Sequence, residues 1–104
     1  MSIEICIINP YATDKSNAKL KQCVSEVIDK NSTVYINQNS NLEDYYSYYL
    51  ETANVSKIVK EIESNNSSDA FIIACYEDTG IDVIRKITSR PVIGIGEAAF
   101  YTAN

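Results

Sequence analysis

The segment DAFIIACYEDTG, residues 69–80, constrains the fold of this chain more than any other part of the sequence. Its residues run without polar alternation from Phe71 to Ala74, which is typical of a parallel strand covered by helices on both faces. The run ends at Cys75, and Gly80 then opens a helical segment. Because open α/β sheets place their chemistry at the carboxyl ends of strands, we expect Cys75 to meet a crevice at that edge and not the core.

The rest of the sequence alternates between short β-rich segments and segments with helical periodicity. β-Branched and aromatic residues mark the strands, and apolar residues spaced by three and four mark the helices. This alternation predicts one flavodoxin-like α/β domain over residues 1–104, with a four-stranded parallel sheet, an internal first strand and helices on both faces. The other expected strands span residues 3–8, 33–36 and 91–95, and the expected helices begin after Thr13 or Ser16, at Leu42, at Gly80 and at Gly96.

Two of the three cysteines are interpreted as core residues, because a free cysteine behaves as a small hydrophobic side chain. Cys6 lies within the first strand. Cys23 lies in the first helix, which we expect to end near Asn31. Its apolar stripe consists of Leu20, Cys23, Val24, Val27 and Ile28. The second helix is expected to reach Ile62 with a break near Asn54.

Charge and composition exclude several classes of function. The net charge of −5 and the absence of a Lys or Arg cluster argue against a nucleic-acid partner. The chain has no histidine and no Cys-x-x-Cys pair, so a zinc site or histidine catalysis is a poor interpretation. No apolar stretch approaches the roughly 20 residues of a membrane helix, and we expect a reduced, cytoplasmic protein without a metal or a membrane partner.

Cys75 is the candidate catalytic residue. The start of a helix favours the thiolate form of a nearby cysteine, whereas the competing interpretation is a buried structural thiol. Ile81 stands where a cysteine phosphatase needs its phosphate-binding arginine, six positions after the nucleophile. The loop after the first strand also lacks the glycines of a dinucleotide site.

Three segments together resemble the Asp/Glu/hydantoin racemase family. They are Ile8–Pro10, Asp69–Gly80 and Pro91–Ala99, and their order and spacing agree over essentially the whole chain. The resemblance implies cofactor-independent racemisation of a small amino-acid or hydantoin-like substrate. In this chemistry one thiolate removes a proton next to a carbonyl and a second thiol returns one from the opposite face. Cys75 matches the first of these two cysteines.

The same resemblance implies substrate-binding roles for Asn9, Tyr76 and Glu77. Asn9 would place the substrate or orient the thiol, although a turn residue before proline is an equal alternative. The backbone amides of Tyr76 and Glu77 would bind a substrate oxygen. Glu97 is expected in the first turn of a helix from the helix dipole alone. The chain departs from the family pattern at Tyr11 and Ala12, where relatives carry a polar pair, and the carboxylate of Glu77 would repel an anionic substrate.

The resemblance implies two similar lobes, and the length of 104 residues corresponds to the first of them, so we expect this chain to lack the second lobe and its cysteine. We therefore expect a lobe that is incomplete or inactive alone, or that works with a separately encoded second lobe or as a homodimer. The alternative is a small flavodoxin-like binding module, for instance for a flavin, or a partner-dependent subunit without catalysis. Its four clustered tyrosines would contact a ring or a partner, or simply pack on the second helix, at positions 45, 46, 48 and 49.

Overall fold

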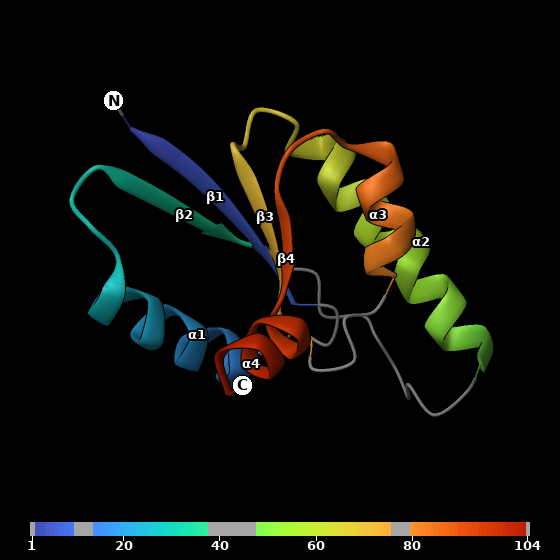
Figure 1. The fold of residues 1–104 in the computed structure, drawn as a ribbon, viewed down its shortest axis with the longest axis horizontal. Helices are drawn as coiled ribbons and strands as arrows, with labels where there is room; N and C mark the ends of the chain where they lie inside the picture. Colours follow the sequence, from blue (N-terminus) through green and yellow to red (C-terminus); the bar gives the residue numbers. More distant parts are fainter. Residues whose placement is uncertain (1, 10–13, 38–47, 76–79, 104) are drawn as a thin grey trace.

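A computed structural model describes residues 2–9, 14–37, 48–75 and 80–103 of the chain as a parallel sheet with helices on its two faces (Figure 1). The strands lie in the order β2-β1-β3-β4, and every neighbouring pair is parallel. This order confirms the predicted flavodoxin-like sheet with the first strand inside it. The elements are β1 (Ile3–Ile8), α1 (Asp14–Val27), β2 (Ser32–Ile36), α2 (Tyr48–Ser64), β3 (Ala70–Ile73), α3 (Ile81–Ile87), β4 (Val92–Gly94) and α4 (Ile95–Ala103).

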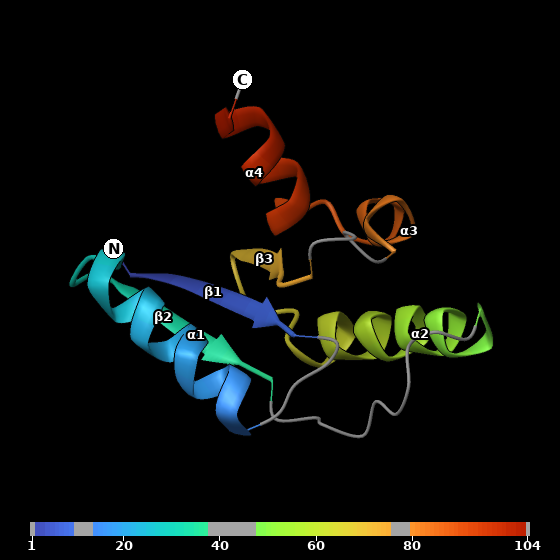
Figure 2. The same cartoon turned by 90° about the horizontal axis from the view of Figure 1, so that it is seen from below.

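The hydrophobic core lies between the sheet and the helices α2 and α3. Side chains alternate between the two faces of a strand, so every second residue of β1, β3 and β4 points toward these helices. Figure 2 shows α2 and α3 on one side of the sheet and α1 on the other. The buried cluster consists of Cys6, Ile8, Phe71, Ile73, Cys75 and Val92 with Ile58, Ile62 and Ile84 from the two helices.

The expectation that β3 is buried on both faces is wrong for half of its residues. Phe71 and Ile73 are buried, whereas Ile72, between them, is only partly buried. Helix α1 covers the opposite face beside β1 and β2, and it leaves part of β3 and β4 without a helix (Figure 2). The apolar side chains of β3 are therefore fully covered by helices on one face of the sheet and only partly covered on the other.

Cys23 is exposed, which corrects its assignment to the core. Val27 of the same predicted stripe is 84% exposed. The sheet-facing side of α1 carries buried Asn17 and partly buried Val24 and Ile28. Each residue turns an α-helix by about 100°, so Cys23 and Val27, each one position before a member of this set, point sideways to solvent. The predicted stripe is therefore right for Leu20, Val24 and Ile28, which are partly buried, and wrong for Cys23 and Val27.

Several predicted boundaries shift by a few residues. Helix α1 ends at Val27 and not near Asn31, and Ser16 lies inside it and does not cap it. Helix α2 runs through Asn54 without a break, and the part of the predicted helix from residue 42 to residue 47 lies outside the described residues. Ile95 belongs to α4 and not to β4. Among the described residues, no helix is long and apolar enough to cross a membrane.

The burial of the three thiols predicts their order of reaction in the folded protein. Exposed Cys23 should react with a small alkylating reagent well before Cys75, and fully buried Cys6 should react last. Burial raises the pKa of the Cys6 thiol to about 12, and the charge of Glu61 is a second cause of this increase. Peptide mass spectrometry over a time course measures the three rates, with the unfolded chain as control. Equal rates for Cys6 and Cys23 without denaturant would contradict this core.

Candidate active site

The candidate site lies at the carboxyl edge of the sheet, where β1 and β3 end side by side. In their register Ile8 lies opposite Ile73, and the Ala74 N–H donates to the Ile8 carbonyl at 2.8 Å. Asn9 and Cys75 therefore follow neighbouring strand ends, and Gly96 follows the end of β4 at the same edge. The prediction that these three positions share one rim is confirmed by the parallel register.

Cys75 is more buried than a crevice position requires. Its exposed fraction is 8%, and it belongs to the hydrophobic cluster with Ile8, Ile73 and Ile84. The expectation that Cys75 avoids the core is therefore wrong for this structure. The alternation of β3 continues through Ala74, so Cys75 points to the same face as Ile73, toward α2 and α3. The thiol therefore lies inside the core, at the end of the core that is nearest the carboxyl edge of the sheet.

Asn9 is buried and its side chain is directed to the other face of the sheet. Its Nδ2 donates to Ser16 Oγ at 3.0 Å and to Asn17 Oδ1 at 3.3 Å, both in the first turns of α1. The two side chains that the sequence placed at one rim thus point to opposite faces, although the residues follow adjacent strands. This geometry supports a structural role for the Asn9 amide in connecting β1 to α1.

Two further asparagines complete the network, and the sequence analysis did not identify them. The Asn9 N–H donates to Asn37 Oδ1 at 2.7 Å, and Asn37 Nδ2 donates back to the Asn9 carbonyl at 3.2 Å. Asn17 Nδ2 donates to the Asn37 carbonyl at 2.9 Å. All three asparagines are buried. For Asn37 the signal in the sequence is its position directly after a strand, like that of Asn9, since parallel strands end at the same edge. Asn17 lies within α1 and has no such signal.

Backbone groups fix the orientation of each amide in this network. A backbone N–H only donates and a carbonyl only accepts, so the contacts of Asn37 with Asn9 leave one arrangement of its oxygen and nitrogen. The bond from Asn17 Nδ2 to a carbonyl likewise directs Asn17 Oδ1 toward Asn9. The Asn9 side chain must then present its NH₂ group to α1. The network joins β1, β2 and α1 into one rigid corner of the rim.

Gly80 lies at the start of α3, as the sequence predicted, and the structure shows that this position requires glycine. Its φ of 70° lies in the left-handed region, and a Cβ there would approach the side-chain methyl carbons of Val55 to 2.9 Å. Glycine therefore permits both the turn and the close approach of α3 to α2. Tyr76 and Glu77, between Cys75 and this turn, lie outside the described residues.

Glu97 connects the start of α4 to α3 and not to the rim. Its carboxylate accepts hydrogen bonds from Arg85, and Glu97 Oε1 accepts from the Gly94 N–H at 3.3 Å. The hydrogen bond from Arg85 lowers the pKa of Glu97, and the contact therefore contributes stability above the ordinary carboxyl pKa that is lost as the pH falls through the lowered value. The first-turn position was predicted, whereas the arginine partner was not.

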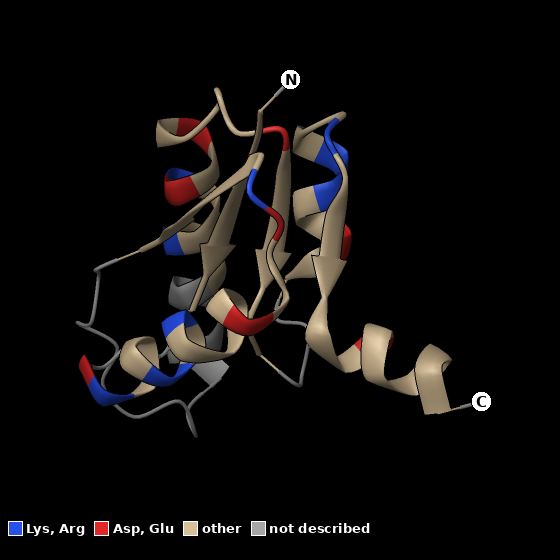
Figure 3. Ribbon diagram, turned by 90° about the vertical axis from the view of Figure 1, so that its left-hand side faces the viewer, with Lys and Arg blue, Asp and Glu red and all other residues tan. Residues whose placement is uncertain are grey.

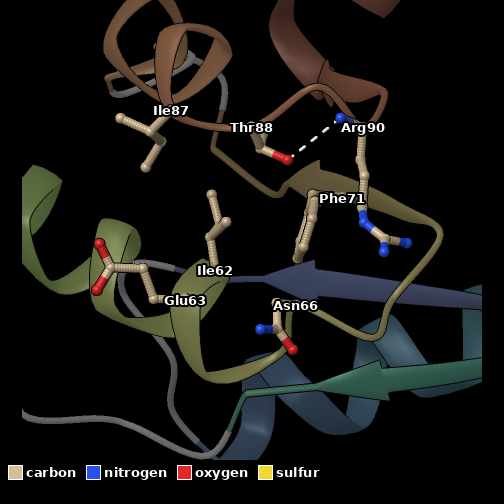
Figure 4. A pocket seen from close by; sticks show the side chains of 7 residues that line it. All are labelled: Ile62, Glu63, Asn66, Phe71, Ile87, Thr88 and Arg90. Carbon is tan, nitrogen blue, oxygen red and sulfur yellow. Dashed lines mark hydrogen bonds between the residues drawn. The ribbon is translucent and has the colours of Figure 1, made fainter.

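A pocket of about 210 Å³ opens at the opposite, amino edge of the sheet (Figure 4). Ile62, Phe71 and Ile87 contribute its apolar walls. The Arg90 guanidinium beside it donates to the Ser68 carbonyl, and the Arg90 N–H donates to Thr88 Oγ1 at 3.2 Å. The strands separate this pocket from the rim that carries Asn9 and Cys75.

Comparison with known proteins gives the family. The Asp/Glu/Hydantoin racemase model matches residues 5–104. The chain belongs to this family.

Curated relatives agree with this assignment. A hydantoin racemase from Paenarthrobacter aurescens is 27% identical over 98% of this chain and 45% of its own length. A hydantoin racemase from Pseudomonas sp. (strain NS671) is 38% identical over 62% of this chain and 26% of its own length. The structure of an allantoin racemase from Klebsiella pneumoniae matches 98% of this chain and 43% of its own with a TM-score of 0.85 at 22% identity, which shows the shared fold. The chain spans less than half the length of these relatives.

The asparagine network predicts a pH-dependent effect of Asn37→Asp. The introduced carboxylate would face the Asn9 carbonyl where Asn37 Nδ2 now donates, so the free energy of unfolding should fall by about 1–3 kcal/mol at neutral pH. Protonation restores a donor, and burial against the Asn9 carbonyl raises the pKa of the introduced carboxyl above its ordinary value of about 4. The loss should therefore shrink as the pH falls through the raised pKa, and it should be smallest at about pH 4. Chemical unfolding across this pH range measures the effect.

The matched control for that experiment is Asn66→Asp, at an exposed asparagine outside the network. It should change stability little at either pH. Equal effects of the two substitutions at neutral pH would show that the network does not stabilise the rim.

Proposed function

We propose that this chain is an N-terminal lobe of the Asp/Glu/hydantoin racemase type, carrying one of the two catalytic thiols. Cys75 would be the base that removes the proton from a carbon next to a carbonyl in an amino-acid or hydantoin-like substrate. The C–H bonding pair would pass into the carbanion, whose charge spreads to the carbonyl oxygen, and the proton would move to Sγ. The reaction needs no cofactor in this proposal.

The family match over residues 5–104 is the observation that carries the proposal. The position of Cys75 supports it, because the cysteine follows β3 at the edge where α/β sheets bind their ligands. Asn9 would act by holding the corner of the rim through Asn17 and Asn37. The backbone amides of Tyr76 and Glu77 would stabilise the developing negative charge on the substrate oxygen.

One thiol exchanges a proton on one face of the substrate but does not invert the carbon. Inversion requires a proton donor on the opposite face of the substrate, and neither Cys6 nor Cys23 provides it. Cys6 is buried in the core between β1 and the helices α2 and α3, and Cys23 lies on the solvent side of α1. A second lobe or a second copy of the chain would supply that thiol. Such chemistry needs reduced cysteines, so the proposal includes a reducing, cytoplasmic setting.

A binding module without catalysis is the second candidate, and the burial of Cys75 favours it. An 8% exposed thiol inside a hydrophobic cluster fits a structural cysteine as well as a catalytic one. In that case the lobe would retain the fold of the family and contribute binding surface to a partner. The two candidates differ in whether the thiol reacts.

Deuterium exchange at the substrate α-carbon separates the two candidates. The chain is incubated in heavy water with one enantiomer of a 5-substituted hydantoin, and with aspartate and glutamate in parallel. We expect deuterium to enter faster than in buffer, with the starting configuration retained, because one thiol removes and returns the proton on one face. Cys75→Ala should lower the rate by about 100-fold or more, to the background.

Cys23→Ala is the matched control, since its thiol is exposed and lies on the far side of α1, and it should leave the rate unchanged. Equal exchange by the chain and by Cys75→Ala would remove Cys75 from the chemistry. Exchange no faster than buffer with all three substrates would contradict the catalytic proposal and support the binding module.

A further inference from the structure

Helix α4 projects from the sheet without burying any of its residues. Its first turn contacts Arg85 of α3 through Glu97, and the rest of the helix extends away from the sheet (Figures 2 and 3). Phe100 and Tyr101 near its end are 64% and 73% exposed, and their rings contact edge to face at a centroid distance of 5.6 Å. Beyond Glu97 the helix carries no charged residue. A helix end that carries no charge and exposes two aromatic side chains presents a surface suited to a partner.

The connection between β4 and α4 prevents this helix from covering its own sheet. Gly94 ends β4 and Ile95 begins α4, so no loop residue separates the two elements. A helix that packs back on its sheet normally follows a connection of about 2–6 residues. The contacts of Glu97 with Arg85 and with the Gly94 N–H further hold the direction of α4. The exposed parts of its two aromatic side chains are therefore accessible to a second molecule.

The same chain leaves an apolar strip of the sheet uncovered. We define this strip as Ile72, Ile93 and the adjacent Val27 of α1. Ile72 and Ile93 are paired in the register of β3 and β4, and Ile93 is 45% exposed. A pocket of about 290 Å³, which Val27 and Ile72 help to line, opens beside the strip, between α1 and the sheet. The strip thus combines an exposed apolar surface with a hollow that can receive a side chain.

We propose that two copies of this chain associate by reciprocal exchange, with α4 of each copy packed on the apolar strip of the other. The projecting helix and the uncovered strip are complementary surfaces of one molecule, so one two-fold axis satisfies both. The three residues of the strip and the part of α4 after Glu97 carry no charge, so two copies with a net charge of −5 can bring these residues together without placing like charges in contact. The strip accepts Phe100, and Tyr101 packs at its margin.

The size of the surfaces predicts a weak dimer. An aromatic side chain buries about 150–250 Å², so two helices on two strips reach roughly 1,000 Å² of buried surface, the lower end of specific interfaces. Because α4 begins at the edge that carries Cys75, this partner would stand beside the candidate site. The inference rests on the proposed function, because it names the partner that would stand beside the candidate site. Dimerisation and proton exchange are measured in separate experiments, so either result can be negative while the other is positive.

Sedimentation of the 104-residue chain over a wide concentration range tests the dimer. We expect a reversible monomer–dimer equilibrium whose dissociation constant rises about tenfold or more in Phe100→Glu and in Ile93→Lys. Phe100→Glu changes a residue that is not buried, so it should leave the fold intact by circular dichroism. Val83→Glu, at an exposed apolar residue of α3 outside both surfaces, is the matched control and should not alter the equilibrium.

Mixing the two weakened variants tests the exchange itself. In a mixed dimer the unchanged helix of Ile93→Lys meets the unchanged strip of Phe100→Glu, and the two introduced charges face each other at the second contact. The mixture should therefore dimerise more tightly than either variant alone, whereas packing of α4 on α4 would give no such gain. A chain that stays monomeric at the highest concentration, or variants that dimerise like the unchanged chain, would overturn the inference.

Discussion

The pairing of β1 with β3 is the constraint on which the rest of this structure depends. The register that sets Ile8 opposite Ile73 aligns the ends of two strands that are far apart in the sequence. It also aligns alternate side chains, so that Cys6, Ile8, Phe71 and Ile73 form one apolar face for α2 and α3. A shift by one residue would turn this face toward α1 and move Cys75 away from the core. Core and candidate site are therefore specified by the same register.

The two sides of the sheet are completed to different degrees. The face toward α2 and α3 carries a continuous buried cluster, whereas the face toward α1 leaves Ile93 and the projecting α4 without a cover among the described elements. The relatives of this family are more than twice as long as the chain. Inversion of a substrate and the proposed packing of α4 would each require a second unit beside the rim, whereas proton exchange by one thiol would not.

The sequence predicted what depends on periodicity and on chain order. Alternating β and helical segments led to the parallel sheet and its strand order, and the rim position of Cys75 followed from the end of the apolar run. Prediction failed where neighbours in space decide the outcome. Cys23 has apolar spacing but is exposed, because the side of α1 that faces the sheet carries Asn17 and Val24. Cys75 is buried because β3 continues its alternation past Ala74 into the core, which length and composition do not reveal.

The most direct test of the account is to map where a ligand binds. Amide chemical shifts of the isotope-labelled chain, recorded during titration with a 5-substituted hydantoin, locate the contact residue by residue. The account predicts shifts at the carboxyl edge, around Asn9, Cys75 and the start of α4. Shifts confined to the opposite edge, around the pocket of Phe71 and Arg90, or no shifts at saturating ligand, would contradict it.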